Sequence, residues 1–228
     1  MLRKRLYELH FGPAQVASRD SVRMRLAEAS KSVEANKFSL HFLLSEWEQI
    51  VDAWQINTWE SYRDVVRLGR KTRLPENERL ALWSIFERVL TGLSEANFVT
   101  QAYIFSRLAR KVFEDERYPF DFAVIDEAQD VSIAQLRFLG ALGAKRRNAL
   151  FFAGDLGQRI FQPAFSWKAL GVDVRGRSAT LKVNYRTSHQ IQIQADRLLG
   201  PEVPTVPTAT TVPVRLSSSR NGASGPLP

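Results

Sequence analysis

Apolar side chains recur at helical spacing through the middle of the chain, from about residue 41 to residue 117. Positions three and four residues apart share one face of an α-helix, so each such series predicts a helix with one buried stripe. The stripes are Leu43, Trp47, Ile50 and Trp54; Leu82, Phe86, Val89 and Leu93; and Phe105, Leu108 and Val112. We interpret the Trp residues on them as core side chains rather than as platforms for nucleic-acid bases.

The pattern changes after Pro119 into short apolar runs that stop at polar residues, as buried parallel strands do. These runs cover residues 122–125, 149–153 and 181–183. The spacing also predicts helices over residues 133–142 and 187–198, and Ser132 with Gln135 fits a capping box at the start of the first. Strands that alternate with helices predict an α/β fold with a parallel sheet.

The two ends of the chain differ from this middle part. Residues 1–40 are polar and basic, which indicates either a segment that needs the rest of a larger protein to pack against or a loosely held helix. Residues 201–228 hold six of the ten Pro and cannot bury a core, so we expect a disordered tail. The predicted division is 1–40, 41–117 (helical), 118–200 (α/β) and 201–228.

Charge and composition narrow the class of protein. The net charge of +8 favours a polyanionic partner, with nucleic acid first, although a basic surface also serves solubility alone. No apolar run approaches the roughly 18–20 residues that span a bilayer, so we expect no membrane partner. The chain has no Cys, which suits a cytoplasmic protein.

Acidic residues follow the first predicted strand directly. Asp126 and Glu127 come at its carboxyl end, where open α/β sheets bind ligands. A carboxylate at this place can hold Mg²⁺, and its neighbour can deprotonate an attacking water. The alternative is that the two acids are merely solvated. Gln129 and Asp130, which follow them in the same motif, count against this alternative.

Residues 126–130 resemble the Walker B box of UvrD/Rep-type superfamily 1 DNA helicases. Residues 153–161 are similar to the family's next box, in which Gly-Asp is followed by Gln and an apolar–aromatic pair. Residues 181–187, with an Asn-Tyr-Arg core, resemble the box after that. The resemblance covers roughly residues 41–200 and implies a partial RecA-like motor domain of the P-loop NTPase type that carries a helical accessory insert.

The resemblance implies a role for each matching residue, with ATP and Mg²⁺ as cofactors. Asp126 would bind Mg²⁺, and Glu127 would be the catalytic base. Gln158 would sense the γ-phosphate and couple it to DNA. Tyr185 would stack on adenine, and Arg186 would reach the γ-phosphate. From the residues alone, Tyr185 could equally be a packing aromatic.

Three aromatic side chains follow the second box. Phe161, Phe165 and Trp167 could stack on the bases of single-stranded DNA, each contact contributing about 1–3 kcal/mol, or they could pack in the core. The segment around Pro163 is longer than in the family pattern, so the sequence leaves open which of them contacts DNA.

The family's glycine-rich phosphate loop, which ends in Gly-Lys-Thr, does not occur in this chain. Residues 68–72 match it only in part, because an Arg precedes the Lys and the upstream Gly of the loop is missing. The boxes of the second motor domain are absent too, which suggests a truncated or frameshifted gene. The leading interpretation is a fragment of an ATP-dependent DNA helicase, inactive alone. The alternatives are a non-enzymatic remnant that binds single-stranded DNA and a module completed by another polypeptide that supplies the loop.

Overall fold

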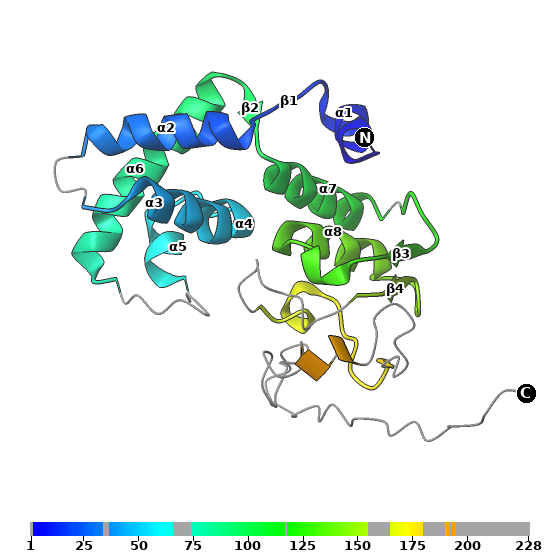
Figure 1. Ribbon diagram of the computed structural model, residues 1–228. Helices are drawn as coiled ribbons and strands as arrows, with labels where there is room; N and C mark the ends of the chain where they lie inside the picture. The colour runs from blue at the N-terminus through cyan, green and yellow to red at the C-terminus, as the bar shows by residue number, and fades with distance from the viewer. Residues whose placement is uncertain are drawn as a thin grey trace, which may run out of the picture.

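The structure, a computed structural model, describes residues 2–33, 37–65, 74–116, 118–154 and 165–179, together with 190, 191, 193 and 194. A helical unit contains α2 (Arg19–Lys31), α3 (Leu40–Glu46), the π-helix η1 (Trp47–Val51), α4 (Asp52–Trp54), α5 (Trp59–Asp64) and α6 (Glu76–Glu95). An α/β unit contains α1 (Leu2–Phe11), α7 (Gln101–Asp115), β3 (Ala123–Ile125), the 3-10 turn η2 (Ala128–Asp130), α8 (Ile133–Gly143), β4 (Leu150–Phe152) and the 3-10 turn η4 (Lys168–Leu170). The two units lie side by side (Figure 1).

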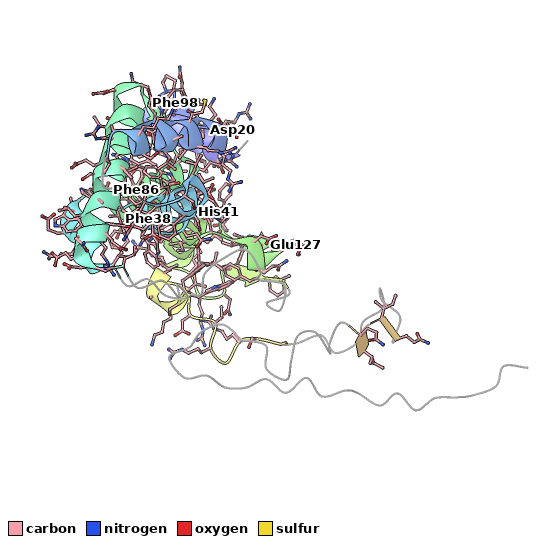
Figure 2. The ribbon with its side chains drawn as sticks, turned by 60° about the vertical axis from the view of Figure 1, so that its left-hand side comes forward. Asp20, Phe38, His41, Phe86, Phe98 and Glu127 are labelled. Carbon is pink, nitrogen blue, oxygen red and sulfur yellow. The ribbon has the colours of Figure 1, made fainter. Side chains whose placement is uncertain are left out.

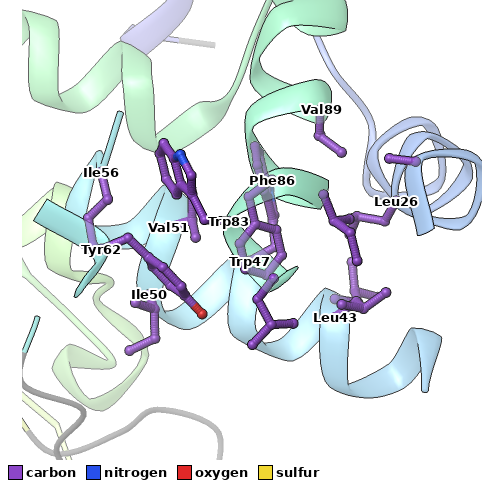
Figure 3. Close-up of a cluster of buried hydrophobic side chains, with 14 of the residues drawn as sticks. Leu26, Leu43, Trp47, Ile50, Val51, Ile56, Tyr62, Trp83, Phe86 and Val89 are labelled. Carbon is purple, nitrogen blue, oxygen red and sulfur yellow. The ribbon is translucent and has the colours of Figure 1, made fainter. Parts of the chain in front are cut away.

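The predicted helical stripes form the core of the helical unit. Leu43, Trp47 and Ile50 are buried together with all four stripe residues of α6. Tyr62 belongs to the same cluster, and its ring meets that of Phe86 edge-on at 5.6 Å (Figure 3). Burying a side chain of this size contributes about 1.5–3 kcal/mol, so this cluster is the main source of stability of the unit. The prediction that the stripe Trp residues serve the core is confirmed for Trp47, whereas Trp54 at the end of its stripe is only partly buried.

Polar side chains fix where several helices begin. Ser18, Ser39, Thr58 and Thr100 each accept a hydrogen bond from the backbone N–H three residues further on. Such N-caps contribute about 1 kcal/mol each because they satisfy donors that the helix itself leaves free. Helix α6 begins directly after Pro75, which is its N-cap residue.

The N-terminal segment packs against the chain itself, which neither sequence interpretation foresaw. Val22, Leu26 and Ala29 of α2 join the core of the helical unit. Strand β1 (Gln15–Val16) pairs in parallel with β2 (Phe98–Val99), which immediately precedes α7. Helix α1 packs on α7 through Tyr7. Most of the basic residues of 1–40 lie exposed on α1 and α2.

Two strands of the α/β unit confirm the predicted parallel pairing. In the register of β3 and β4, Ala123 lies opposite Leu150 and Ile125 opposite Phe152. Helix α8 follows η2, and the capping box of Ser132 and Gln135 is present. Mixed helices and small parallel sheets establish an α/β fold. The predicted third strand, most of the last predicted helix and the tail lie outside the described residues.

The prediction that these strands are buried is wrong for one face of β3 and β4. The side chains of Phe122, Val124 and Phe151 are 71%, 77% and 64% exposed. Successive side chains of a strand point to opposite faces. Ile125 and Phe152 meet the core built around α8, while the alternate side chains meet no covering element among the described residues.

Within the described part of the chain, no helix is long and apolar enough to cross a membrane.

Candidate functional site

Asp126 and Glu127 stand at the carboxyl end of β3, where the sequence places them. Both side chains are exposed to solvent. Figure 2 shows Glu127 at the margin of the α/β unit, away from the helical core that holds Phe86. The β3–β4 pair thus presents two adjacent carboxylates at the sheet edge where α/β proteins bind ligands.

The backbone of Glu127 takes a left-handed conformation, with φ 50° and ψ 47°. A residue with a Cβ loses about 1–2 kcal/mol there, so neighbouring contacts have to hold it. Its N–H donates to Oδ1 of Asp126 at 2.9 Å, and Nε2 of Gln129 donates to its Oε2 at 2.5 Å. The chain turns sharply after the strand, and the Glu127 carboxylate is oriented by a buried amide.

Gly154, at the start of the second box, lies against the turn that carries the acids. The N–H of Ala128 donates to the carbonyl oxygen of Ala153 at 2.9 Å. A Cβ on Gly154 would come within 2.5 Å of Oε1 of Gln129 and 2.7 Å of the backbone nitrogen of Ala128. Only glycine fits this approach, so Ala153 and Gly154, the described start of the second box, lie directly against the first box.

From the sequence, Gly154 and Gln129 have a place in the two boxes but no role of their own. The structure gives both a function in positioning Glu127. A Gly directly after an apolar run was the available signal, because glycine in such a place often marks a close backbone approach.

The other expected nucleotide contacts lie outside the described residues. These are Gln158, Tyr185 and Arg186, together with the possible DNA contact Phe161. Of the predicted ATP site, the described residues therefore bring together Asp126 and Glu127, and the roles of the other residues stay predictions.

Phe165 and Trp167 are described, and both are core residues. Their side chains are 2% and 4% exposed, and the ring of Phe152 meets that of Trp167 edge-on at 4.8 Å. They pack with Leu136 of α8 in one cluster. In this arrangement neither ring offers a face to a base. Phe165 and Trp167 therefore pack in the core, which was the second of the two alternatives, because residues 165–172 cover the inner side of the sheet.

The two carboxylates fit Mg²⁺ in chemical type. This ion is held by one or two carboxylates, with water and substrate phosphates completing its octahedron. Asp126 and Glu127 supply exposed oxygens of that kind. Among the described residues no group of three or more His, Cys, Asp or Glu forms a fuller metal site. The pair suits an ion that arrives together with phosphates rather than one caged by protein.

Comparison with known proteins adds a family and a relative. The model of the UvrD/REP helicase N-terminal domain matches residues 12–166, which include both acids and Gly154. An ATP-dependent helicase/nuclease subunit from Lactobacillus helveticus (strain DPC 4571) is 27% identical over 139 residues. That stretch covers 60% of this chain and 11% of the relative, so the chain spans a small part of the relative's length.

Proposed function

Since the chain belongs to the UvrD/REP helicase family, we propose that it is part of the RecA-like first motor domain of an ATP-dependent DNA helicase. In the intact protein this domain couples ATP hydrolysis to translocation on single-stranded DNA. The observation that carries the proposal is the pair Asp126 and Glu127 at the end of β3, with Glu127 held by Gln129 and backed by Gly154.

The proposed chemistry divides between the two acids. Asp126 holds Mg²⁺, which neutralises phosphate charge when it is bound with a nucleotide. Glu127 takes the proton of the attacking water, a contribution of roughly 10²–10⁴-fold in rate. The hydrogen bond from Gln129 engages Oε2, so it fixes the direction in which the carboxylate accepts that proton. Gln158, Tyr185 and Arg186 complete the proposed nucleotide contacts.

The chain alone does not supply everything that ATP needs. Its sequence has no Gly-Lys-Thr loop, whose backbone amides and Lys cradle the phosphates. The uncovered face of β3 and β4, with Val124 and Phe151, supports the proposal that further protein packs there in the intact domain. We therefore propose a fragment that is inactive alone, completed either by more of its own domain or by a polypeptide that carries the loop.

A second candidate function is a remnant that binds single-stranded DNA without hydrolysing ATP. The net charge of +8 favours it, because cations bind the phosphate backbone whatever the state of the nucleotide site.

Phosphate release by the purified chain tests the proposed incompleteness. Positioning of the phosphates can lower the barrier by roughly 7–11 kcal/mol, more than the base supplies. We expect Mg²⁺-dependent ATP hydrolysis by the chain to be no faster than by Glu127→Gln, with or without single-stranded DNA. If the chain turns ATP over and Glu127→Gln abolishes that activity, the missing loop is not required and the proposal of an inactive fragment fails.

A further inference from the structure

Helices α1 and α7 lie together on the side of the molecule away from the helical core (Figure 1). Their side chains line a hollow that is open to solvent. The hollow has a volume of about 140 Å³ and is lined by Phe11, Arg107, Arg110, Lys111 and Glu114. Each water molecule takes about 30 Å³ of liquid volume, so the hollow admits a phosphate-sized group with some of its hydration. Below it, Tyr7, Ile104 and Leu108 pack in one apolar cluster that fixes the two helices against each other.

Cations dominate this hollow. The Arg107 guanidinium lies over the ring of Phe11, 4.5 Å from its centroid, and 5.9 Å from the centroid of Tyr103. This stacking holds the group in place while its N–H donors stay available. Burial raises the pKa of the Tyr7 hydroxyl, as does Tyr103, whereas the positive charge of Arg107 opposes the rise.

The acidic side chains nearby neutralise only part of this charge. Nζ of Lys111 pairs with Asp115 at 2.9 Å. Arg107 and Arg110 have no carboxylate within ion-pair distance in the part of the chain that the structure describes. Together α1 and α7 carry six Lys or Arg against three Asp or Glu, so the surface keeps a positive balance.

We propose that this hollow binds phosphate groups of a nucleic-acid backbone, with Arg107 and Arg110 as the donors. The inference rests on the proposed function only in taking single-stranded DNA as the source of the phosphates. Two arginine forks on adjacent helical turns suit oxyanions, and Arg107 loses little freedom on binding because Phe11 already holds it.

The hollow is not a feature of the matched domain alone. The family model begins at residue 12, while Phe11 and the rest of α1 come before it. One wall of the hollow therefore comes from a segment outside the match, and the other from α7 within it. The expected backbone contact belongs to this chain's own combination of the two helices.

Charge reversal on the exposed wall of the hollow tests the proposal. We would measure binding of the full chain to a fluorescent oligothymidylate by anisotropy at 50 mM salt. For single strands, the logarithm of the binding constant falls with the logarithm of the salt concentration at a slope of about 0.7 per phosphate contacted. At 50 mM salt, the loss of one phosphate contact therefore lowers the affinity roughly eightfold. We expect Arg110→Glu to weaken binding by at least that factor. Arg147→Glu, an equal charge change at an exposed residue between α8 and β4, should weaken binding by less than about threefold, since it loses no contact.

A substitution of opposite effect guards against a variant that merely misfolds. Glu114→Gln removes the one carboxylate that lines the hollow and should tighten binding, while Glu28→Gln on α2 should change it less. Equal weakening by Arg110→Glu and Arg147→Glu would overturn the proposal, as would no weakening by Arg110→Glu in a folded protein. Calorimetry with inorganic phosphate separates the two sources. Phosphate binding that Arg110→Glu abolishes, with DNA binding unchanged, would overturn the nucleic-acid assignment. The proposed function is tested separately, by comparing ATP hydrolysis by the chain with that by the Glu127→Gln variant.

Discussion

At the scale of single residues, the site depends on a close approach between two turns. Glu127 adopts a left-handed conformation, Gln129 orients its carboxylate, and Gly154 leaves room for both. The sequence predicted that Asp126 and Glu127 lie at the end of a strand, because two acids directly after an apolar run are typical of such a site. It could not predict what Gly154 touches, since a contact between residues 25 positions apart depends on how two strands pair.

Gly154→Ala tests this approach. The new Cβ would meet the backbone nitrogen of Ala128, which cannot move without shifting the turn, so we expect a loss of about 1–3 kcal/mol in the free energy of unfolding. Gly92→Ala on α6 is the matched control. Its Cβ would meet only the end of the Arg25 side chain, and alanine favours a helix interior, so we expect a gain of about 0.5–1 kcal/mol. Urea denaturation of both variants measures the difference, and equal effects would contradict the packing described.

At the scale of elements, helical spacing located α6, α7 and the helix of α3 to α4, and the apolar runs located β3 and β4. Prediction failed where the pattern is weak or depends on distant partners. Val22, Leu26 and Ala29 of α2 recur at helical spacing, but polar and basic residues surround them and none of the three is aromatic, so the stripe did not stand out. They nevertheless reach the core. The uncovered face of β3 was unpredictable, because an apolar run is the same whether or not a second layer covers it.

At the junction between the helical and α/β units, Asp52 and Gln55 at the two ends of α4 lie near Thr100, the N-cap of α7. Thr100 Oγ1 donates to Oδ1 of Asp52 at 2.5 Å, and Nε2 of Gln55 donates to the same oxygen at 3.0 Å. Burial raises the pKa of Asp52 from 3.8 to about 6, the two hydrogen bonds oppose the rise, and the charge of Glu48 adds to it. The folded protein thus holds this proton more tightly than the unfolded chain does.

This difference makes the junction sensitive to pH. Between about pH 4 and pH 6 the unfolded chain releases the Asp52 proton before the folded protein does. The free energy of unfolding should therefore fall as the pH rises across this window, by up to about 3 kcal/mol. Asp52→Asn, which stays neutral, should remove that fall and be more stable than the wild type at pH 7.5, with little difference at pH 4. Thermal unfolding at several pH values measures it. Glu87→Gln, at an exposed residue of α6, should keep the wild-type profile. A destabilised Asp52→Asn at pH 7.5 would contradict the account.

At the scale of the whole molecule, charge and the family match point to one partner class. A net charge of +8 attracts a phosphate backbone, and the matched family acts on DNA. The sequence predicted the family because three boxes occur in order. It could not show where the basic residues gather, since that depends on how α1 packs on α7.

Salt dependence tests this electrostatic contribution. If the chain contacts at least three phosphates, its affinity for single-stranded DNA should fall by roughly 20-fold between 50 and 200 mM salt, at a slope of about 0.7 per phosphate. Fluorescence anisotropy across this range measures the slope. Undetectable binding at 50 mM salt would remove the DNA-binding remnant as a candidate function.

The most direct test of the central claim, that Glu127 is the base of an incomplete helicase site, is ATP hydrolysis by a completed protein. The chain would be joined to a family segment that carries the phosphate loop and to a second motor domain. We expect DNA-stimulated hydrolysis, lowered by about 10²–10⁴-fold in Glu127→Gln, because the base is lost while the nucleotide contacts stay. Glu87→Gln in the same protein should leave the rate unchanged. A completed protein in which Glu127→Gln hydrolyses ATP as fast as the unsubstituted form would contradict the account.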